Sequence, residues 1–448
     1  MHKRILRISL TAALAGFLFG FDTVVISGAN QPIKDIWPTS PLFHGTFIMS
    51  MALWGTVLGS LMGGIPTKIL GRKTSLFWIG VLFFISAVGC AFAPDPYSFS
   101  FFRFVGGIGV GISSVAAPIY ISEITPANMR GKLGGLYQFW LVFGILAAFI
   151  SNWLLKGFDG ANDWRWMLGV EAIPALLYTI MVLKIPKSPR WLLLQKKDEV
   201  AALDILESLN EKSVASAQLK AIKEDAESGV RTESLFQKKY SKVLWLGFLI
   251  AFFNQLSGIN FVLYYAPEIL EQAGLGGKES LFNSIAIGIV NLLFTIIGVR
   301  LLDSLGRRQL IIIGSIGYIF SLIMVGICFQ FTLPSMYTLV FICLFVASHA
   351  IGQGAVIWVF ISEIYPNRVR AFGQSWGTGT HWVFAALITL VTPVFLDDTS
   401  GLLKDAVWHI YYFFAGMMVL QLLWAIFKMP ETKGIPLEAL SEKLGIHK

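Results

Sequence analysis

The chain contains twelve apolar runs of membrane-crossing length, and this feature restricts its fold more strongly than any other. A bilayer core about 30 Å thick needs about 20 helical residues, and each segment in lipid must satisfy its own backbone hydrogen bonds. The runs therefore predict an all-α membrane protein with twelve transmembrane helices. They start near Ile8, Thr46, Thr74, Ser98, Leu133, Trp166, Val243, Ser280, Gln309, Ser335, Ala371 and Val407.

Composition agrees with this prediction and excludes other classes. Only 14% of the residues are charged, 55% are hydrophobic and the mean hydropathy is +0.68, which excludes an ordinary soluble enzyme and a disordered chain. The net charge of +8 is attributed to membrane topology, because no basic patch interleaved with aromatic residues indicates nucleic acid. No metal-ligand cluster, nucleophile triad or phosphate loop is present, so we expect no enzyme activity and no cofactor. The basic N-terminus resembles a signal peptide, but the apolar run continues to Ile26, which favours an uncleaved first span.

The short connections between runs predict the orientation, because Lys and Arg collect on the cytoplasmic side. Alternate loops are rich in basic residues, and these loops lie on the same side of the membrane as both termini. The basic residues are Lys68, Arg72, Lys73, Arg130, Lys132, Arg307, Arg308, Arg368 and Arg370. We therefore expect a multi-pass protein of the cell (inner) membrane with both termini cytoplasmic. The predicted division is a six-helix bundle over 1–185, a cytoplasmic helical linker over 186–242, a second six-helix bundle over 243–429 and a cytoplasmic tail over 430–448.

The two bundles are related by an internal repeat. YISEITPANMRGKLG, from Tyr120, recurs as FISEIYPNRVRAFGQ from Phe360, and LGRK, from Leu70, recurs as LGRR from Leu305. PKSPR, from Pro186, has a looser counterpart in PETKG, from Pro430. A duplicated six-span unit predicts a site near the membrane midplane between the halves, reached from alternate sides as the halves rock.

The repeated motifs carry charges at the cytoplasmic ends of the spans. We expect them to form ion-pair networks that hold the outward-facing state and break on rocking, although ordinary anchoring at the membrane interface would give the same pattern. These predicted gate residues are Arg72, Glu123, Arg130, Arg307, Glu363 and Arg370.

From Gly16 to Gly434 the chain resembles the sugar porters of the major facilitator superfamily, most closely the bacterial proton-coupled D-xylose and hexose symporters. The resemblance rests on GFLFGFDTVVISGA, RFVGGIGVG, PIYISEITPANMRG, DWRWM, PKSPRWL, QLSGINFVLYYAP and PETKG. It implies a monosaccharide and protons as transported partners. Two positions depart from the family pattern: Lys68 stands where Asp or Asn is usual, and Lys187 replaces the Glu of PESPR.

Three ionisable residues stand within spans of the first half, where a charge is costly and usually functional: Asp22, Arg103 and Glu171. A buried carboxylate beside a cation can load and release a proton as water access alternates between the two sides. The resemblance gives Asp22 the proton-binding role, Arg103 the role of its partner and Glu171 a role in coupling. A static buried ion pair is the alternative.

Sugar recognition needs amides for hydroxyl groups and an aromatic face for the ring. The spans offer Gln138, Gln255, Asn260, Asn291 and Trp358, each at a sugar-contacting position of the family. Asn254 stands where the family commonly has a second Gln, and His381 where it has Gln or Asn. We expect His381 to be a neutral hydrogen-bonding residue, with a second proton site as the alternative. Phe19 is a further candidate for the pocket, although core packing explains it equally well.

Taken together, these features predict a proton-coupled monosaccharide symporter that imports a hexose or pentose by alternating access and functions as a monomer in the lipid bilayer. A passive sugar uniporter is the nearest alternative, and a non-transporting sugar sensor is a more distant one.

Overall fold

The computed structural model describes residues 2–126, 129–227, 233–366, 368–435, 440, 444 and 446, and every regular element in these residues is helical. This confirms the predicted all-α class. The first half contains α1 (His2–Ile36), α2 (Pro41–Phe43), η1 (His44–Met49), α3 (Met51–Met62), α4 (Gly64–Ile69), α5 (Arg72–Phe92), α6 (Pro96–Ile124), α7 (Arg130–Leu155), η3 (Gly160–Asn162), α8 (Asp163–Gly169) and α9 (Ala172–Leu183). The second half contains η5 (Lys238–Tyr240), α13 (Ser241–Gln255), α14 (Ile259–Gln272), α15 (Gly277–Leu305), α16 (Arg307–Gln330), α17 (Ser335–Ile351), α18 (Gln353–Glu363), α19 (Arg370–Leu396) and α20 (Trp408–Phe427).

Eleven helical segments of the described chain are long and apolar enough to cross a membrane. Pro41–Met49 and Met51–Met62 form a further pair that is bent by 43°. When this pair is counted as one span, it is the run predicted from near Thr46, and the total is the predicted twelve. The bend follows a π-helical turn, η1, whose irregular hydrogen bonding ends at Ser50.

Three other spans are interrupted near their middle. The span 160–183 breaks before Glu171, the span 238–272 breaks between Gln255 and Ile259, and the span 335–363 breaks at Gly352. Gly258 has φ +86°, a left-handed conformation that favours glycine, so the second break is built into the sequence. Broken membrane helices expose backbone and polar groups where a ligand site can form.

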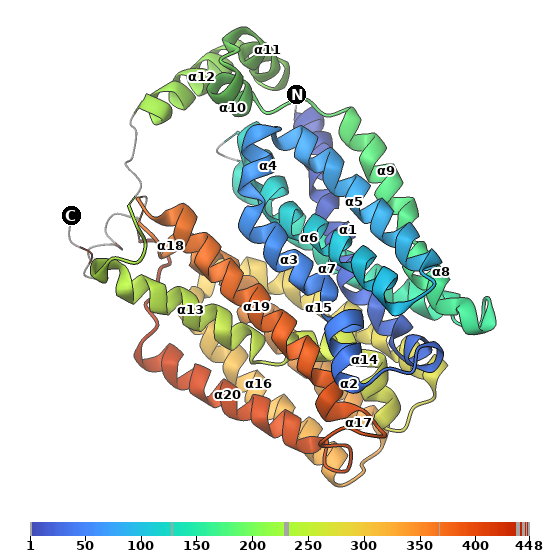
Figure 1. Ribbon diagram of the computed structural model, residues 1–448. Helices are drawn as coiled ribbons and strands as arrows, with labels where there is room; N and C mark the ends of the chain where they lie inside the picture. Colours follow the sequence, from blue (N-terminus) through green and yellow to red (C-terminus); the bar gives the residue numbers. More distant parts are fainter. Residues whose placement is uncertain are drawn as a thin grey trace.

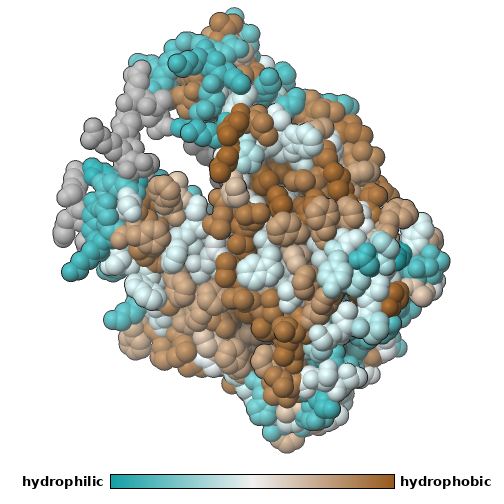
Figure 2. Space-filling model, viewed as in Figure 1, coloured by the Kyte–Doolittle hydropathy of each residue, from teal (hydrophilic) through white to brown (hydrophobic). Residues whose placement is uncertain are grey.

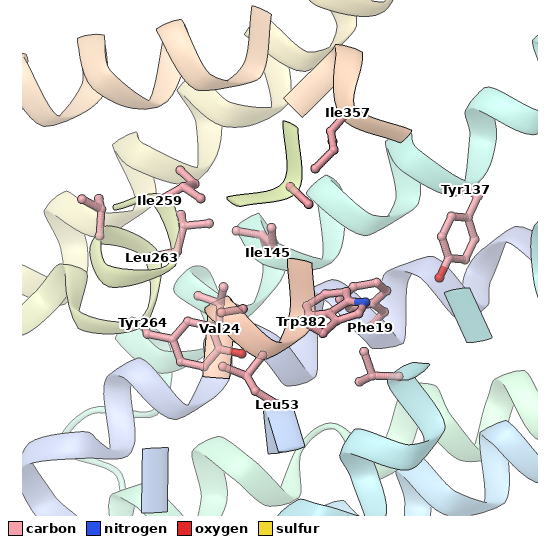
Figure 3. Close-up of a cluster of buried hydrophobic side chains, with 14 of the residues drawn as sticks. Phe19, Val24, Leu53, Tyr137, Ile145, Ile259, Leu263, Tyr264, Ile357 and Trp382 are labelled. Carbon is pink, nitrogen blue, oxygen red and sulfur yellow. The ribbon is translucent and has the colours of Figure 1, made fainter. Parts of the chain in front are cut away.

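The halves meet where α1 packs against α14, α7 against α15, and α19 against α2, η1 and α3 (Figure 1). Between them lies an apolar cluster to which both halves contribute. Figure 3 shows Phe19 and Val24 from α1, with Tyr264 from α14 and Trp382 from α19.

The segment between the halves carries α10 (Pro189–Trp191), η4 (Leu192–Lys196), α11 (Glu199–Leu209) and α12 (Lys212–Glu227). In Figure 1 these helices lie at the end of the molecule where the chain begins. We call this end, with Arg72 and Arg307, the predicted cytoplasmic end, and the opposite end the predicted outer end. Figure 2 shows hydrophilic residues over α10–α12 and hydrophobic residues along the sides of the bundle, as expected for helices that face lipid.

Candidate functional site

A buried ion pair joins α1 to α6 in the first half. Arg103 donates from Nη1 to Asp22 Oδ1 at 2.7 Å and from Nη2 to the Asp22 carbonyl oxygen at 3.2 Å, and the two side chains are 1% and 2% exposed. Next to this pair, a Cβ at Gly106 would lie 2.4 Å from Ser86 Oγ, so glycine allows α6 to pass close to Ser86. Each partner therefore compensates a charge that would otherwise be isolated in the bundle.

Glu171 adds a second carboxyl group to this pair. It is 2% exposed, stands at the break before α9, and interacts electrostatically with both Asp22 and Arg103. Its Oε1 atom has no hydrogen-bond partner among the described residues. Two buried carboxylates beside one guanidinium would leave one negative charge uncompensated, which is costly in a dry bundle. The cluster is therefore suited to hold one exchangeable proton.

Tyr264 brings the second half to this cluster. It lies on α14, is 1% exposed, and interacts electrostatically with Arg103 and Asp22 and by a side-chain hydrogen bond with Thr23 of α1. In Figure 3 its ring lies beside Val24. Tyr264 thus places a polar group of the second half within electrostatic range of the proton candidates of the first half.

The amide candidates of the second half cluster at the break between α13 and α14. Asn260 donates to Gln255 Oε1 at 2.8 Å, and Gln255 donates to Asn254 Oδ1 at 2.9 Å. Gln255 Nε2 also lies 3.2 Å from each ring nitrogen of His381. Because an amide nitrogen only donates, one ring nitrogen must accept, which agrees with the expected neutral histidine.

Aromatic rings surround His381. Its ring centroid lies 4.8 Å from that of Trp358 and 4.7 Å from that of Trp382. Trp382 in turn lies 5.6 Å from Phe19 across the boundary between the halves. The set of amides, a histidine and aromatic faces can bind a polyol ring through hydroxyl hydrogen bonds and C–H contacts.

Two candidates stand apart from this cluster. Gln138 is half-buried on α7, and Asn291 is 5% exposed on α15, where its Oδ1 accepts from Thr295 at 3.5 Å. Within the described chain neither side chain hydrogen-bonds to the amides at the α13–α14 break.

The gate candidates form two equivalent ion pairs, one in each half. Arg72 donates to both carboxylate oxygens of Glu123 at 2.9 and 2.8 Å, and Arg307 donates to both oxygens of Glu363 at 3.1 and 2.7 Å. Arg370 donates to the Tyr365 carbonyl oxygen at 3.3 Å. The Arg130 side chain lies outside the part that the structure describes. Both pairs join residues of the same half, so they brace each bundle at its predicted cytoplasmic end.

The repeat also supplies each pair with a hydroxyl donor. Ser188 of PKSPR donates to Glu123 at 2.5 Å, and Thr432 of PETKG donates to Glu363 at 2.7 Å. The neighbouring residues differ. Glu431 accepts the backbone N–H groups of Arg307 and Arg308 at 3.0 Å each and so caps α16, whereas its counterpart Lys187 cannot cap α5 in this way.

A third network, which the sequence did not indicate, joins the halves at the predicted outer end. Lys34 Nζ lies 2.8 Å from Glu268 Oε1 and 4.0 Å from Asp397 Oδ2. Asn30 donates to Glu268 Oε2 at 2.5 Å and lies 2.6 Å from His44 Nε2. Partial burial acts to raise the pKa of Asp397, but hydrogen bonds from Thr399 and Ser400 outweigh it and bring the pKa to about 2. Among the described residues, the ion pairs that join the two halves all involve Lys34.

Two cavities lie outside the amide cluster. One of about 780 Å³ is mostly apolar and opens between α3, α13 and α19, beside Leu61 and Trp376. The other, of about 200 Å³, lies next to Glu268 at the predicted outer end. Among the described residues, no group of His, Cys, Asp and Glu side chains is arranged to hold a metal ion.

Comparisons with known proteins agree on one family. The family model described as "Sugar (and other) transporter" matches residues 8–444. The D-xylose-proton symporter of Escherichia coli (strain K12) is 33% identical, over 97% of this chain and 95% of the relative. The arabinose-proton symporter of Bacillus subtilis (strain 168) is 34% identical, over 99% of this chain and 95% of the relative. Among solved structures, the partially occluded inward-open conformation of the E. coli xylose transporter XylE matches with a TM-score of 0.86 and 31% identity, over 97% of this chain and 100% of that one.

Proposed function

Because the chain belongs to the sugar transporter family of the major facilitator superfamily, we propose that it is a proton-coupled monosaccharide symporter of the plasma membrane. It imports a hexose or pentose by alternating access. It is a transporter and not an enzyme, and its sugar and proton partners follow from the symporters to which it is similar.

The observation that carries proton coupling is the buried cluster of Asp22, Arg103 and Glu171. Its one guanidinium compensates only one of the two carboxylates. A proton on the second carboxyl group removes the uncompensated charge, so the cluster can take up and release a proton at a small cost in free energy. A proton on Asp22 weakens the pairing with Arg103 and favours sugar binding from outside. After the halves rock, the same cluster faces the cytoplasm and the proton leaves.

The sugar site in this proposal lies at the α13–α14 break. Asn260, Gln255 and Asn254 supply amide groups, His381 supplies a ring N–H, and Trp358 and Phe19 supply aromatic surface. Gln138 and Asn291 approach from α7 and α15 when the site closes around the sugar. Tyr264, one turn after Asn260, links this site to the proton cluster.

The state described by the structure is inward-facing in this proposal. Ion pairs between the halves occur at the predicted outer end, and the match to an inward-open relative points the same way. Arg72–Glu123 and Arg307–Glu363 are both formed in this state, so in this proposal they brace the cytoplasmic end of each half and do not break when the transporter faces inward. The chain functions as a monomer in the bilayer with both termini cytoplasmic, and it is divided as 1–185, 186–242, 243–429 and 430–448.

The test replaces Asp22 with Asn and measures two activities of the purified protein in liposomes: uphill uptake driven by a pH gradient, and sugar counterflow without a gradient. We expect uphill uptake to be lost and counterflow to be kept, because sugar exchange does not require proton release. Asp303→Asn, which removes an exposed carboxylate, is the matched control. Unchanged uphill accumulation in Asp22→Asn would contradict the coupling role of Asp22, whereas no uphill uptake by the unsubstituted protein, with counterflow kept, would favour a uniporter.

A further inference from the structure

A continuous chain of five amide side chains crosses the second half from the proposed sugar site to α16. It includes Gln353 and Gln421, which no sequence pattern singled out. Each amide donates to the next in one direction: Asn260 to Gln255 at 2.8 Å, Gln255 to Asn254 at 2.9 Å, Asn254 to Gln353 at 3.4 Å, Gln353 to Gln421 at 2.5 Å, and Gln421 to Ser315 at 2.8 Å.

The direction of the chain is set at its far end by Ser315. The Ser315 hydroxyl has one hydrogen, and it donates this hydrogen to the Ile311 carbonyl oxygen at 2.7 Å. Its oxygen must therefore accept from Gln421, so Gln421 turns its Nε2 toward Ser315 and its Oε1 toward Gln353. The same argument applies to each amide in turn: its oxygen accepts from the amide on the Asn260 side, so its nitrogen must donate to the neighbour on the Ser315 side.

Burial makes this direction costly to reverse. Gln353, Gln421 and Ser315 are each 0% exposed, and Gln255 is 1% exposed. Turning one amide would place two oxygens or two N–H groups face to face without water to relieve them. A directed chain of this kind is also strengthened by mutual polarisation.

The chain ties together two helix breaks. Gln255 ends α13 directly before the α13–α14 break, and Gln353 begins α18 directly after the break at Gly352. Residues next to a break lack the full set of intrahelical hydrogen bonds, so side-chain contacts must hold them in place. The amide chain provides these contacts from α16 and α20.

We propose that Gln353, Gln421 and Ser315 are positioning residues for sugar recognition. They fix which atoms Gln255 and Asn260 present, so that the Asn260 Oδ1 atom is free to accept a hydrogen bond from a sugar hydroxyl. This inference rests on the proposed function, and it adds a specificity rule: at one ring position the protein requires a hydroxyl that donates.

The rule is tested with full-length protein in liposomes and labelled D-glucose or D-xylose, whichever the unsubstituted protein takes up. Competition with the complete series of monodeoxy and monofluoro analogues of that sugar gives an inhibition constant for each ring position. Fluorine accepts weakly and cannot donate. At the position read by Asn260, the unsubstituted protein is therefore expected to bind the fluoro and deoxy analogues equally weakly.

Ser315→Ala removes the group that sets the direction. We expect the KM for the parent sugar to rise about three- to tenfold, and the fluoro analogue to bind better than the deoxy analogue at the position read by Asn260, because the Asn260 amide now presents N–H as well. Ser315→Thr keeps a hydroxyl that bonds to the preceding turn, and it should restore the original analogue profile. Ser321→Ala is the control: Ser321 is equally buried on α16 and donates to Gly317 at 2.7 Å, but it lies outside the chain.

Three results would overturn the inference: no ring position with equal loss in the unsubstituted protein, an unchanged analogue profile and KM in Ser315→Ala, or the same altered profile in Ser321→Ala. A merely structural role of Ser315 gives the second result, with less folded protein but normal recognition. If the unsubstituted protein takes up neither sugar while counterflow of every other monosaccharide also fails, the proposed function itself is overturned, and this inference with it.

Discussion

Replacing Lys34 with Met should shift the transporter strongly toward its outward-facing state. Lys34 bonds to Glu268 across the boundary between the halves in the state described, and the two side chains separate when the outer end opens. The substitution therefore removes a contact from one state only. A ligand or mutation shifts a conformational equilibrium by its differential effect on the two states. The free-energy difference between the inward-facing and outward-facing states should therefore change by the full energy of the Lys34–Glu268 pair.

The size of the shift follows from the geometry. Two unit charges about 4 Å apart attract by about 4 kcal/mol at an effective dielectric constant of about 20, and desolvation offsets part of this. Exposed pairs contribute less than about 1 kcal/mol, and breaking a fully buried pair costs about 3–5 kcal/mol. With its side chains 16% and 9% exposed, the Lys34–Glu268 pair lies between these limits, and we expect about 2 kcal/mol. This corresponds to a roughly 30-fold change in the ratio of the two states.

The assay is alkylation of Ser27→Cys by a membrane-impermeant maleimide added from outside, after Cys90, Cys328 and Cys343 are replaced. Ser27 is 5% exposed beside the cavity at the predicted outer end, so its reaction reports opening on that side. The alkylation rate should rise roughly 30-fold in Lys34→Met until opening is no longer limiting.

Two controls make the result specific. Lys278→Met removes an exposed lysine from the same end and should leave the rate unchanged. Lys34→Met combined with Glu268→Gln should give much less than the sum of the single effects, because each substitution removes the same pair. A rate within twofold of the unsubstituted protein in Lys34→Met, or full additivity in the double variant, would refute the reasoning.

Three further predictions address the ends of the bundles. Gly45→Ala should favour the outward-facing state and raise the same alkylation rate, because the new Cβ would lie 1.9 Å from the Leu390 carbonyl oxygen of the other half. Gly64→Ala is the control: its Cβ would meet nothing within 4 Å, and the rate should not change. Lys187→Glu should stabilise the purified protein against thermal unfolding by about 1 kcal/mol, because the new carboxylate would cap α5 as Glu431 caps α16. Lys184→Glu makes an equal charge change nearby and should not stabilise the protein. Glu431→Gln should lower the melting temperature at neutral pH. Partial burial acts to raise the pKa of Glu431, but backbone N–H groups of Lys433, Arg307, Arg308 and Thr432 outweigh it and hold the pKa below 4.5. Its stabilisation is therefore complete above pH 4.5 and lost as the pH falls through the lowered pKa, so the two melting temperatures should converge in acid.

The fold was predictable because lipid leaves few alternatives to spanning helices. Apolar length alone located the twelve spans, but it did not show the bend in Pro41–Met62 or the breaks inside three other spans, since hydropathy averages over a π-helical turn or a short break. Asp22 and Arg103 were identifiable for a related reason: each is an ionisable residue in an apolar run and needs a partner. The sequence could not show that Glu171 stands at a helix break.

The networks that join distant spans were not predictable in this way. Lys34 and Glu268 lie near span ends, where charged residues are common, and their pairing depends on how the halves close. Gln353 and Gln421 are single amides in apolar runs, a pattern that also fits helix–helix packing. The one available signal was the Gly352–Gln353–Gly354 sequence, because two glycines in an apolar run indicate an irregular backbone that nearby polar groups must support.

In the proposed function, sugar binding and proton binding can influence each other through α14. Asn260 and Tyr264 lie one helical turn apart on α14, with the first at the end of the amide chain and the second within electrostatic range of Asp22 and Arg103. A sugar that moves α14 through Asn260 therefore changes the surroundings of the proton cluster through the electrostatic interaction of Tyr264 with Asp22 and Arg103. Linkage requires the reverse effect to be of equal size: the factor by which sugar alters proton affinity must equal the factor by which a proton alters sugar affinity. The amide chain holds the side chains of the proposed sugar site in place. Sugar binding should therefore move α14 as a whole, and this movement changes the surroundings of Asp22 and Arg103, whereas a loosely held site would only rearrange its own side chains.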